Sequence, residues 1–95
     1  MITRIVKLTI TPSKKDEFIA IFKNNNHHIK ACKGCVGVEL LQDQKFDNIF
    51  FTYSHWEDES NLNDYRNSKI FGVIWKATKT TFCSLPEAWS TISIA

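Results

Sequence analysis

The chain has 95 residues, 43% of them hydrophobic, and a net charge of +2. This length and composition are typical of one globular domain. No run of lysines and arginines is present, which argues against nucleic acid or an anionic membrane surface as a partner. No apolar run reaches the roughly 18 residues of a membrane-spanning helix, and the first residues lack a signal-peptide pattern. We therefore expect a cytoplasmic protein, and three cysteines, an odd number, fit reduced thiols there.

The first third of the chain has the pattern of a strand followed by a helix. Side chains of Ile2–Ile10 alternate between two faces, and Arg4 is the exception on the mostly apolar face. Thr11 as the cap and Pro12 at the first helical position predict a helix start. Gly34 stands where a left-handed cap would end this helix. The apolar side of the predicted helix holds Phe18, Ile21, Phe22, Ile29 and Cys32.

Three further stretches alternate like strands: Val36–Gln42, Ile49–Trp56 and Glu87–Ile94. The middle one has large side chains on both faces, which predicts a strand that is covered on both sides. One of its faces carries Phe50, Thr52, Ser54 and Trp56, and the other carries Ile49, Phe51, Tyr53 and His55.

The stretch 56–82 is helical in pattern and rich in aromatic residues. Asp58 can cap a first short helix and Ser68 a second, longer one. Apolar residues then recur at three- and four-residue steps, so they share one helix face. The aromatic members of the whole stretch are Trp56, Tyr65, Phe71, Trp75 and Phe82.

The resulting order is β-α-β-β-α-β, which predicts an α+β, ferredoxin-like fold in a single domain over residues 1–95. In this fold an antiparallel sheet carries helices on one face only. The other face of the sheet would expose large apolar side chains, which is unfavourable in water. A twofold homodimer, with two sheets packed face to face as a barrel, would cover that face.

Several segments resemble the antibiotic biosynthesis monooxygenase domain, of the dimeric α+β barrel superfamily. They are Ile2–Leu8, Cys35–Leu41, Phe51–Glu57, and Tyr65–Ser68 with Phe71 after it. The resemblance implies a homodimer with a cavity between the sheet and the helices of each subunit. It also implies oxidation of aromatic polyketides or quinols with dioxygen and neither metal nor flavin.

Other members of the superfamily degrade haem, and the match to that branch is poor. The haem-degrading pattern has an Asn, a Trp and an axial His at the places held here by Val6, Tyr65 and Trp75. Without the His, a haem iron lacks an obvious ligand. We therefore expect no cofactor and no metal.

For cofactor-free chemistry the site must hold a flat ring, stabilise an anion and exclude water. Trp75, Tyr65, Phe71 and Phe82 can wall such a pocket, with Phe22 and Tyr53 as further substrate contacts. Arg4 or Arg66 can stabilise a phenolate. His28, His27 or His55 can accept the proton, and of these His28 is the candidate base.

Each of these residues also has a structural interpretation. An aromatic stripe at helical spacing is commonly core, Arg4 can be a surface residue at a strand edge, and the histidines can be structural. Cys32 and Cys35 form a C-x-x-C at a helix C-terminus, where the dipole does not activate a thiol. They are better explained as small buried residues flanking a glycine cap.

Two functions remain open at this stage. The first is a cofactor-independent monooxygenase that acts on a small aromatic compound such as a quinol or an anthrone. The second is a non-catalytic dimer that binds a small hydrophobic ligand. Arg4 or a histidine beside Tyr65 and Trp75 inside the cavity would favour chemistry, whereas a cavity lined only by aromatic residues would favour binding.

Overall fold

The computed structural model describes residues 1–95 and has the predicted α+β element order. Two single turns of 3-10 helix, Pro12–Lys14 and Lys79–Thr81, accompany the longer elements. Those elements are β1 (Ile2–Thr9), α1 (Lys15–Lys30), β2 (Cys35–Gln42), β3 (Ile49–Trp56), α2 (Glu59–Arg66), α3 (Lys69–Thr78) and β4 (Glu87–Thr91).

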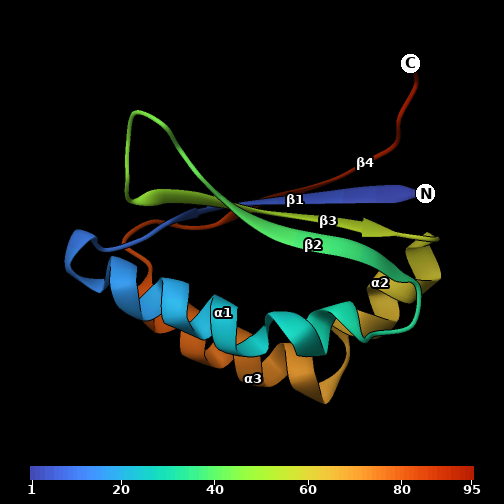
Figure 1. The fold of residues 1–95 in the computed structure, drawn as a ribbon, viewed down its shortest axis with the longest axis horizontal. Helices are drawn as coiled ribbons and strands as arrows, with labels where there is room; N and C mark the ends of the chain where they lie inside the picture. The colour runs from blue at the N-terminus through green and yellow to red at the C-terminus, as the bar shows by residue number, and fades with distance from the viewer.

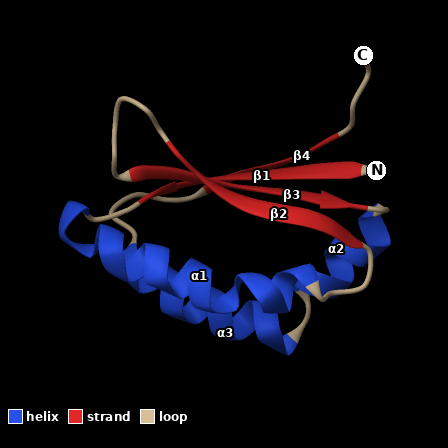
Figure 2. Ribbon diagram, in the orientation of Figure 1, coloured by secondary structure: helices blue, strands red, loops and turns tan.

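The four strands form one antiparallel sheet in the order β2-β3-β1-β4. Figure 1 shows α1 and α3 side by side beneath this sheet, with α2 at one end. All helices lie on the same side in Figure 2, so the opposite face of the sheet is bare. None of the helices is long and apolar enough to cross a membrane.

Local capping explains where the two later helices begin. The Asp58 carboxylate accepts a hydrogen bond from the backbone N–H of Asn61 at 3.0 Å, and the Ser68 hydroxyl accepts one from that of Phe71 at 3.2 Å. Both predicted caps are confirmed. The first helix differs from its prediction, because the side chain of Thr11 makes no capping bond and Pro12 opens a 3-10 turn before α1.

Gly34 has the left-handed conformation that its position predicted, with φ of 81°. The side chain of Asn61 occupies the space that a Cβ at Gly34 would need. Glycine is therefore required here both by backbone conformation and by close packing. The contact fixes the α1–β2 turn against the start of α2.

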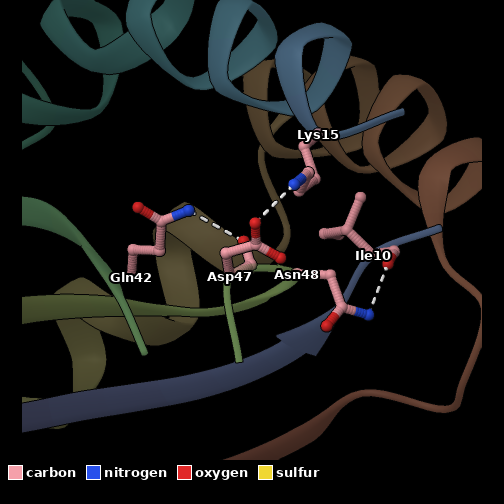
Figure 3. A network of polar contacts seen from close by, with 5 residues as sticks. All are labelled: Ile10, Lys15, Gln42, Asp47 and Asn48. Atoms are coloured by element: carbon pink, nitrogen blue, oxygen red, sulfur yellow. Dashed lines mark hydrogen bonds and ion pairs between the residues drawn. The ribbon is translucent and has the colours of Figure 1, made fainter. Parts of the chain in front are cut away.

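A small polar network closes the end of the sheet that lies away from α2 (Figure 3). The Lys15 ammonium pairs with the Asp47 carboxylate at 2.7 Å, and the side-chain amide of Gln42 donates to the Asp47 carbonyl at 2.8 Å. The side-chain amide of Asn48 donates to the carbonyl of Ile10 at 3.0 Å. These bonds hold the β2–β3 loop against β1 and the first turn of α1.

The buried core consists of two separate clusters between the sheet and the helices. One contains Leu8, Ile10, Phe18 and Phe50, and the other contains Ile29, Val38, Trp56 and Leu62. Residues of both clusters also line one cavity. The fold therefore leaves a hollow between two packed ends, and this hollow is where a ligand site would lie.

Candidate active site

The cavity between the sheet and the three helices has a volume of about 440 Å³. This lies in the range of small-molecule sites. Twelve of its 18 lining residues are hydrophobic. The sheet contributes Arg4, Val6, Leu8, Val38, Thr52, Ser54 and Ala88, the loop before β4 contributes Pro86, and the helices contribute Phe18, Phe22, Ile29, Leu62, Tyr65, Arg66, Phe71, Ile74, Trp75 and Thr78.

Strand register sets the floor of the cavity. Arg4 on β1 pairs with Ser54 on β3 and with Ser90 on β4. The Arg4 guanidinium donates a hydrogen bond from Nη1 to the hydroxyl of Ser90 at 2.9 Å. Two residues along the strand, Val6 stands next to Thr52. The floor is thus polar around Arg4 and becomes apolar toward the other end of β1.

Aromatic rings form a continuous chain along one wall. Trp56 stacks on Tyr65 with centroids 5.1 Å apart, and Tyr65 meets Phe71 edge to face at 5.2 Å. The rings of Phe71 and Trp75 are nearly parallel, with an interplanar angle of 10° and centroids 5.9 Å apart. Phe82 meets Trp75 edge to face, with centroids 5.4 Å apart. The middle three rings line the cavity. Such a wall suits a flat aromatic ligand.

Two hydrogen-bond donors on this wall have no partner in the chain. The indole N–H of Trp56 donates to Ser54 at 3.0 Å, but neither the Tyr65 hydroxyl nor the Trp75 indole N–H makes such a bond. Neither atom is sealed from solvent, since the one fully buried and unpartnered side-chain atom is Oδ1 of Asn26. Both donors are therefore available to a ligand.

Burial, and then the nearby thiols of Cys32 and Cys35, raise the pKa of Tyr65. The phenol therefore stays protonated at neutral pH and acts as a hydrogen-bond donor rather than as a base. Burial also raises the pKa of both Cys32 and Cys35, so these are thiols rather than reactive thiolates.

The charged lining residues are two arginines, Arg4 and Arg66. Burial, and then the positive charge of Arg66, lower the pKa of Arg4. No Asp, Glu or His lines the cavity, and the one ion pair of the chain, Lys15 with Asp47, lies at the other end of β1. The electrostatic character of the site is therefore positive and without an internal counter-ion.

Six of the expected site residues meet at this cavity: Arg4, Phe22, Tyr65, Arg66, Phe71 and Trp75. Five others do not line it: Tyr53, Phe82, His27, His28 and His55. Strand alternation places Tyr53 on the bare face of the sheet, where its ring meets His55 edge to face at 4.7 Å. Tyr53 is therefore out of reach of a ligand under the helices.

His28 and Phe82 also lie outside the cavity lining. His28 is exposed on α1, and its ring lies 3.9 Å from that of His27. Phe82 follows the 3-10 turn that ends the helical region and forms an isolated bridge with Ile10, so it supports Trp75 from outside. The histidines are thus not placed to accept a proton inside the cavity.

Thr52 and Ser54 line the floor of the cavity and are not among the residues expected there from the sequence. A signal was present, because both share a strand face with Phe50 and Trp56. Polar residues within an otherwise buried aromatic face indicate a position that contacts water or has a functional role. The side of α2 on which Arg66 lies depends on packing, and the sequence pattern does not set it.

A second hollow, of about 540 Å³, lies beside β2. Four of its eight lining residues belong to the bare sheet face: Gly37, Glu39, Tyr53 and His55. It lacks the apolar enclosure of the first cavity, so the cavity under the helices is the better ligand site.

The side chains also bear on haem binding. The cavity lining contains no His, Cys or Met, and its one tyrosine is held protonated. These residues do not fit an axially ligated haem iron. No group of three His, Cys, Asp or Glu residues is gathered anywhere in the chain as a metal site.

Comparison with known proteins agrees with the geometry. The sequence profile of the antibiotic biosynthesis monooxygenase family matches residues 1–76. No curated protein matches the sequence. Among solved structures, a conserved protein from Methanosarcina mazei superposes with a TM-score of 0.89 at 22% identity, covering 96% of this chain and 91% of the other.

Two further solved structures share the fold at lower identity. An antibiotic biosynthesis monooxygenase has a TM-score of 0.92 at 16% identity and full coverage of both chains. Rv0793 from Mycobacterium tuberculosis has a TM-score of 0.90 at 11% identity, covering 99% of this chain and 95% of the other. The matched profile spans most of the chain, which therefore belongs to the antibiotic biosynthesis monooxygenase family.

Proposed function

We propose that the protein is a cofactor-independent monooxygenase that oxidises a small aromatic compound, of the quinol or anthrone type, with dioxygen. The observation that carries this proposal is the cavity itself. It combines a flat aromatic wall, two unpartnered donors on Tyr65 and Trp75, and a guanidinium on the floor at Arg4. Together these can hold a planar ring and stabilise negative charge on its oxygen.

The chemistry needs no external reductant, because the substrate supplies the electrons. An anthrone loses a proton to give an enolate, and the enolate passes one electron to dioxygen. The two radicals combine into a carbon-bound peroxide, whose O–O bond breaks with loss of water. The ring carbon gains a carbonyl oxygen, and the other oxygen atom leaves as water. The protein must stabilise the anion.

The residues have distinct roles in this proposal. Arg4 lies on the floor and favours the enolate or phenolate over its neutral form. The Tyr65 hydroxyl and the Trp75 indole N–H are the further donors to the anionic oxygen. Since no carboxylate or histidine lines the cavity, the proton leaves to solvent rather than to a side chain, and Arg4 makes that loss favourable.

We further propose that the functional unit is a homodimer formed through the bare sheet face. That face carries Phe51, Tyr53 and Trp89, and the last of these is 45% exposed. The chain alone exposes 6176 Å², about a tenth more than the roughly 5,600 Å² expected for a monomer of its mass. Packing two such faces together would remove apolar surface from water.

The lack of an internal base favours one alternative, a non-catalytic protein that binds an anionic aromatic ligand. The same cavity would serve that function without turnover. Binding alone would leave the mass of the ligand unchanged after incubation in air.

The test is the mass of the products formed from a panel of quinols and anthrones under isotopically labelled dioxygen, without added metal or flavin. We expect one labelled oxygen atom in the product. The Trp75→Ala and Tyr65→Phe variants should lose most of this label, whereas Lys76→Gln, on the exposed side of α3, should keep it. Absence of label above a protein-free control, with ligand-dependent thermal stabilisation retained, would establish the binding alternative instead.

A further inference from the structure

The mouth of the cavity lies along β4 and the C-terminal end of α2. Arg66 and Ala88 line the cavity and are nevertheless exposed, whereas Leu8, Phe18 and Thr78 line it and are buried. In Figure 1 the end of β4 runs away from the helix layer. A ligand would enter here, with its apolar part directed toward the buried end.

Two positive charges stand at this mouth, and only one of them is needed by the chemistry proposed above. Arg4 is partly buried and donates a hydrogen bond to Ser90, and it lies on the floor of the cavity, where the anion forms. Arg66 is close enough for its charge to lower the pKa of Arg4. No acidic residue lines the cavity, and Arg66 takes part in no ion pair.

Like charges placed together without a counter-ion are unfavourable in the empty protein, and an anion between them would relieve this. A structural explanation exists for each arginine alone. Arg66 lies in the last turn of α2, where a cation is favoured by the helix dipole, and Arg4 satisfies one donor on Ser90. Neither explanation accounts for both guanidinium groups lining the same hollow.

We propose that Arg66 binds a carboxylate carried by the substrate, so that the protein acts on an aromatic acid rather than on a neutral ring. Only the role of the bound acid as a substrate rests on the proposed function, because the same site would select an acidic ligand without turnover. The guanidinium fork matches a carboxylate in two parallel hydrogen bonds.

The length of the cavity floor agrees with such a ligand. Arg4 and Leu8 lie four residues apart on β1, which corresponds to about 13 Å along the floor. The strand runs from the charged mouth to the buried apolar end, where Phe18 and Thr78 also line the cavity. The ligand that fits is elongated, planar and apolar at one end and anionic at the other. Two positive charges would then meet two negative ones, a carboxylate and the enolate formed during the reaction.

The experiment compares anthracene-2-carboxylic acid with its primary amide by titration calorimetry, since the two share ring and size and differ in charge. We expect the wild-type protein to bind the acid about tenfold more tightly than the amide, as a charged hydrogen-bonded pair would give. Arg66→Gln should abolish this preference and leave the affinity for the amide unchanged. Arg66→Lys keeps the charge but loses the paired guanidinium N–H donors, and it should retain only part of the preference for the acid.

Lys76→Gln is the matched control, because it removes one exposed positive charge from outside the cavity. It should leave the acid-to-amide ratio as in the wild type. Since amide affinity is measured for every variant, it also reports whether the cavity is intact. Equal affinity of the wild type for acid and amide, or an unchanged ratio in Arg66→Gln, would overturn the proposal.

The outcome is separable from that of the oxygenase proposal. Charge-selective binding that depends on Arg66, without labelled product, would support the acid site and contradict the oxygenase proposal. Labelled product from neutral and acidic anthrones at equal efficiency, unaffected by Arg66→Gln, would support the oxygenase proposal and contradict the acid site. With both proposals correct, Arg66→Gln should raise KM for an acidic anthrone and leave kcat unchanged.

Discussion

On the face of the sheet that the helices cover, β1 and β3 place Arg4, Thr52 and Ser54, whereas on the bare face the same strands place residues such as Phe51 and Tyr53. A covered cation is costly unless it is paired, and an uncovered aromatic surface is costly in water. Each face is thus incomplete in the isolated chain. The covered face lacks an anion and the bare face lacks an apolar partner, and we therefore propose a ligand for the first and a second subunit for the second.

The largest effect should come from a charge on the bare face. Tyr53→Asp would place a carboxylate in the proposed subunit interface, and we expect it to convert the dimer to monomer or aggregate in light scattering. Gln44→Asp, in the exposed β2–β3 loop, adds the same charge elsewhere and should remain dimeric. A dimeric Tyr53→Asp protein would show that this face is not the interface.

A second effect concerns stability at high pH. The folded-state pKa of Tyr65 is raised above its unfolded value, so the stabilisation from its neutral phenol is complete below the unfolded pKa. It is lost as pH rises from about 10, where the unfolded tyrosine ionises, through the folded pKa. The free energy of unfolding of the wild type, measured with denaturant, should fall over this pH range, and that of Tyr65→Phe should fall less. Equal slopes would contradict burial of the phenol.

These elements also show what could be read from sequence. Caps at Asp58 and Ser68 and the left-handed Gly34 were predictable, because each depends on a few neighbouring residues. The aromatic wall around Trp75 was predictable from helical periodicity. These features are local, and the whole fold order follows from them and from strand alternation.

The rest of the site depends on tertiary packing. Tyr53 was assigned to the ligand, but which strand face meets the helices is fixed only when the sheet is covered. His28 was assigned to catalysis, but the packed side of α1 turns it to solvent. Placing Arg66 near Arg4 requires the angle at which α2 meets the sheet. No short-range pattern encodes that angle.

On the covered face, removing the floor charge should alter the pH dependence of activity. Arg4, Arg66 and Tyr65 are the titratable groups of the cavity, and Tyr65 stays neutral, so the profile should follow ionisation of the substrate. A cation beside the bound substrate lowers its pKa, and Arg4→Gln should raise the apparent pKa of kcat, which reports the enzyme–substrate complex, by about one unit. An unchanged profile would mean that Arg4 does not face the ionising oxygen.

The smallest effect tests the helix that carries the wall. Ser68→Ala removes the hydroxyl that caps α3 and should cost about 1 kcal/mol, seen as a fall in Tm of about 4–8 °C. Ser68→Asp keeps an acceptor at the same place and should restore most of it. A Tm unchanged in Ser68→Ala would show that the cap does not limit the stability of α3.

The most direct measurement uses the three tryptophans, which report on three places: Trp75 on the cavity wall, Trp56 in the buried core and Trp89 on the bare face. Each indole N–H gives its own signal in a nitrogen–proton correlation spectrum. Titration with anthracene-2-carboxylic acid should move the Trp75 signal strongly and leave that of Trp89 in place. Movement of Trp89 with Trp75 unchanged would place the ligand on the bare face and contradict the assignment of the two faces.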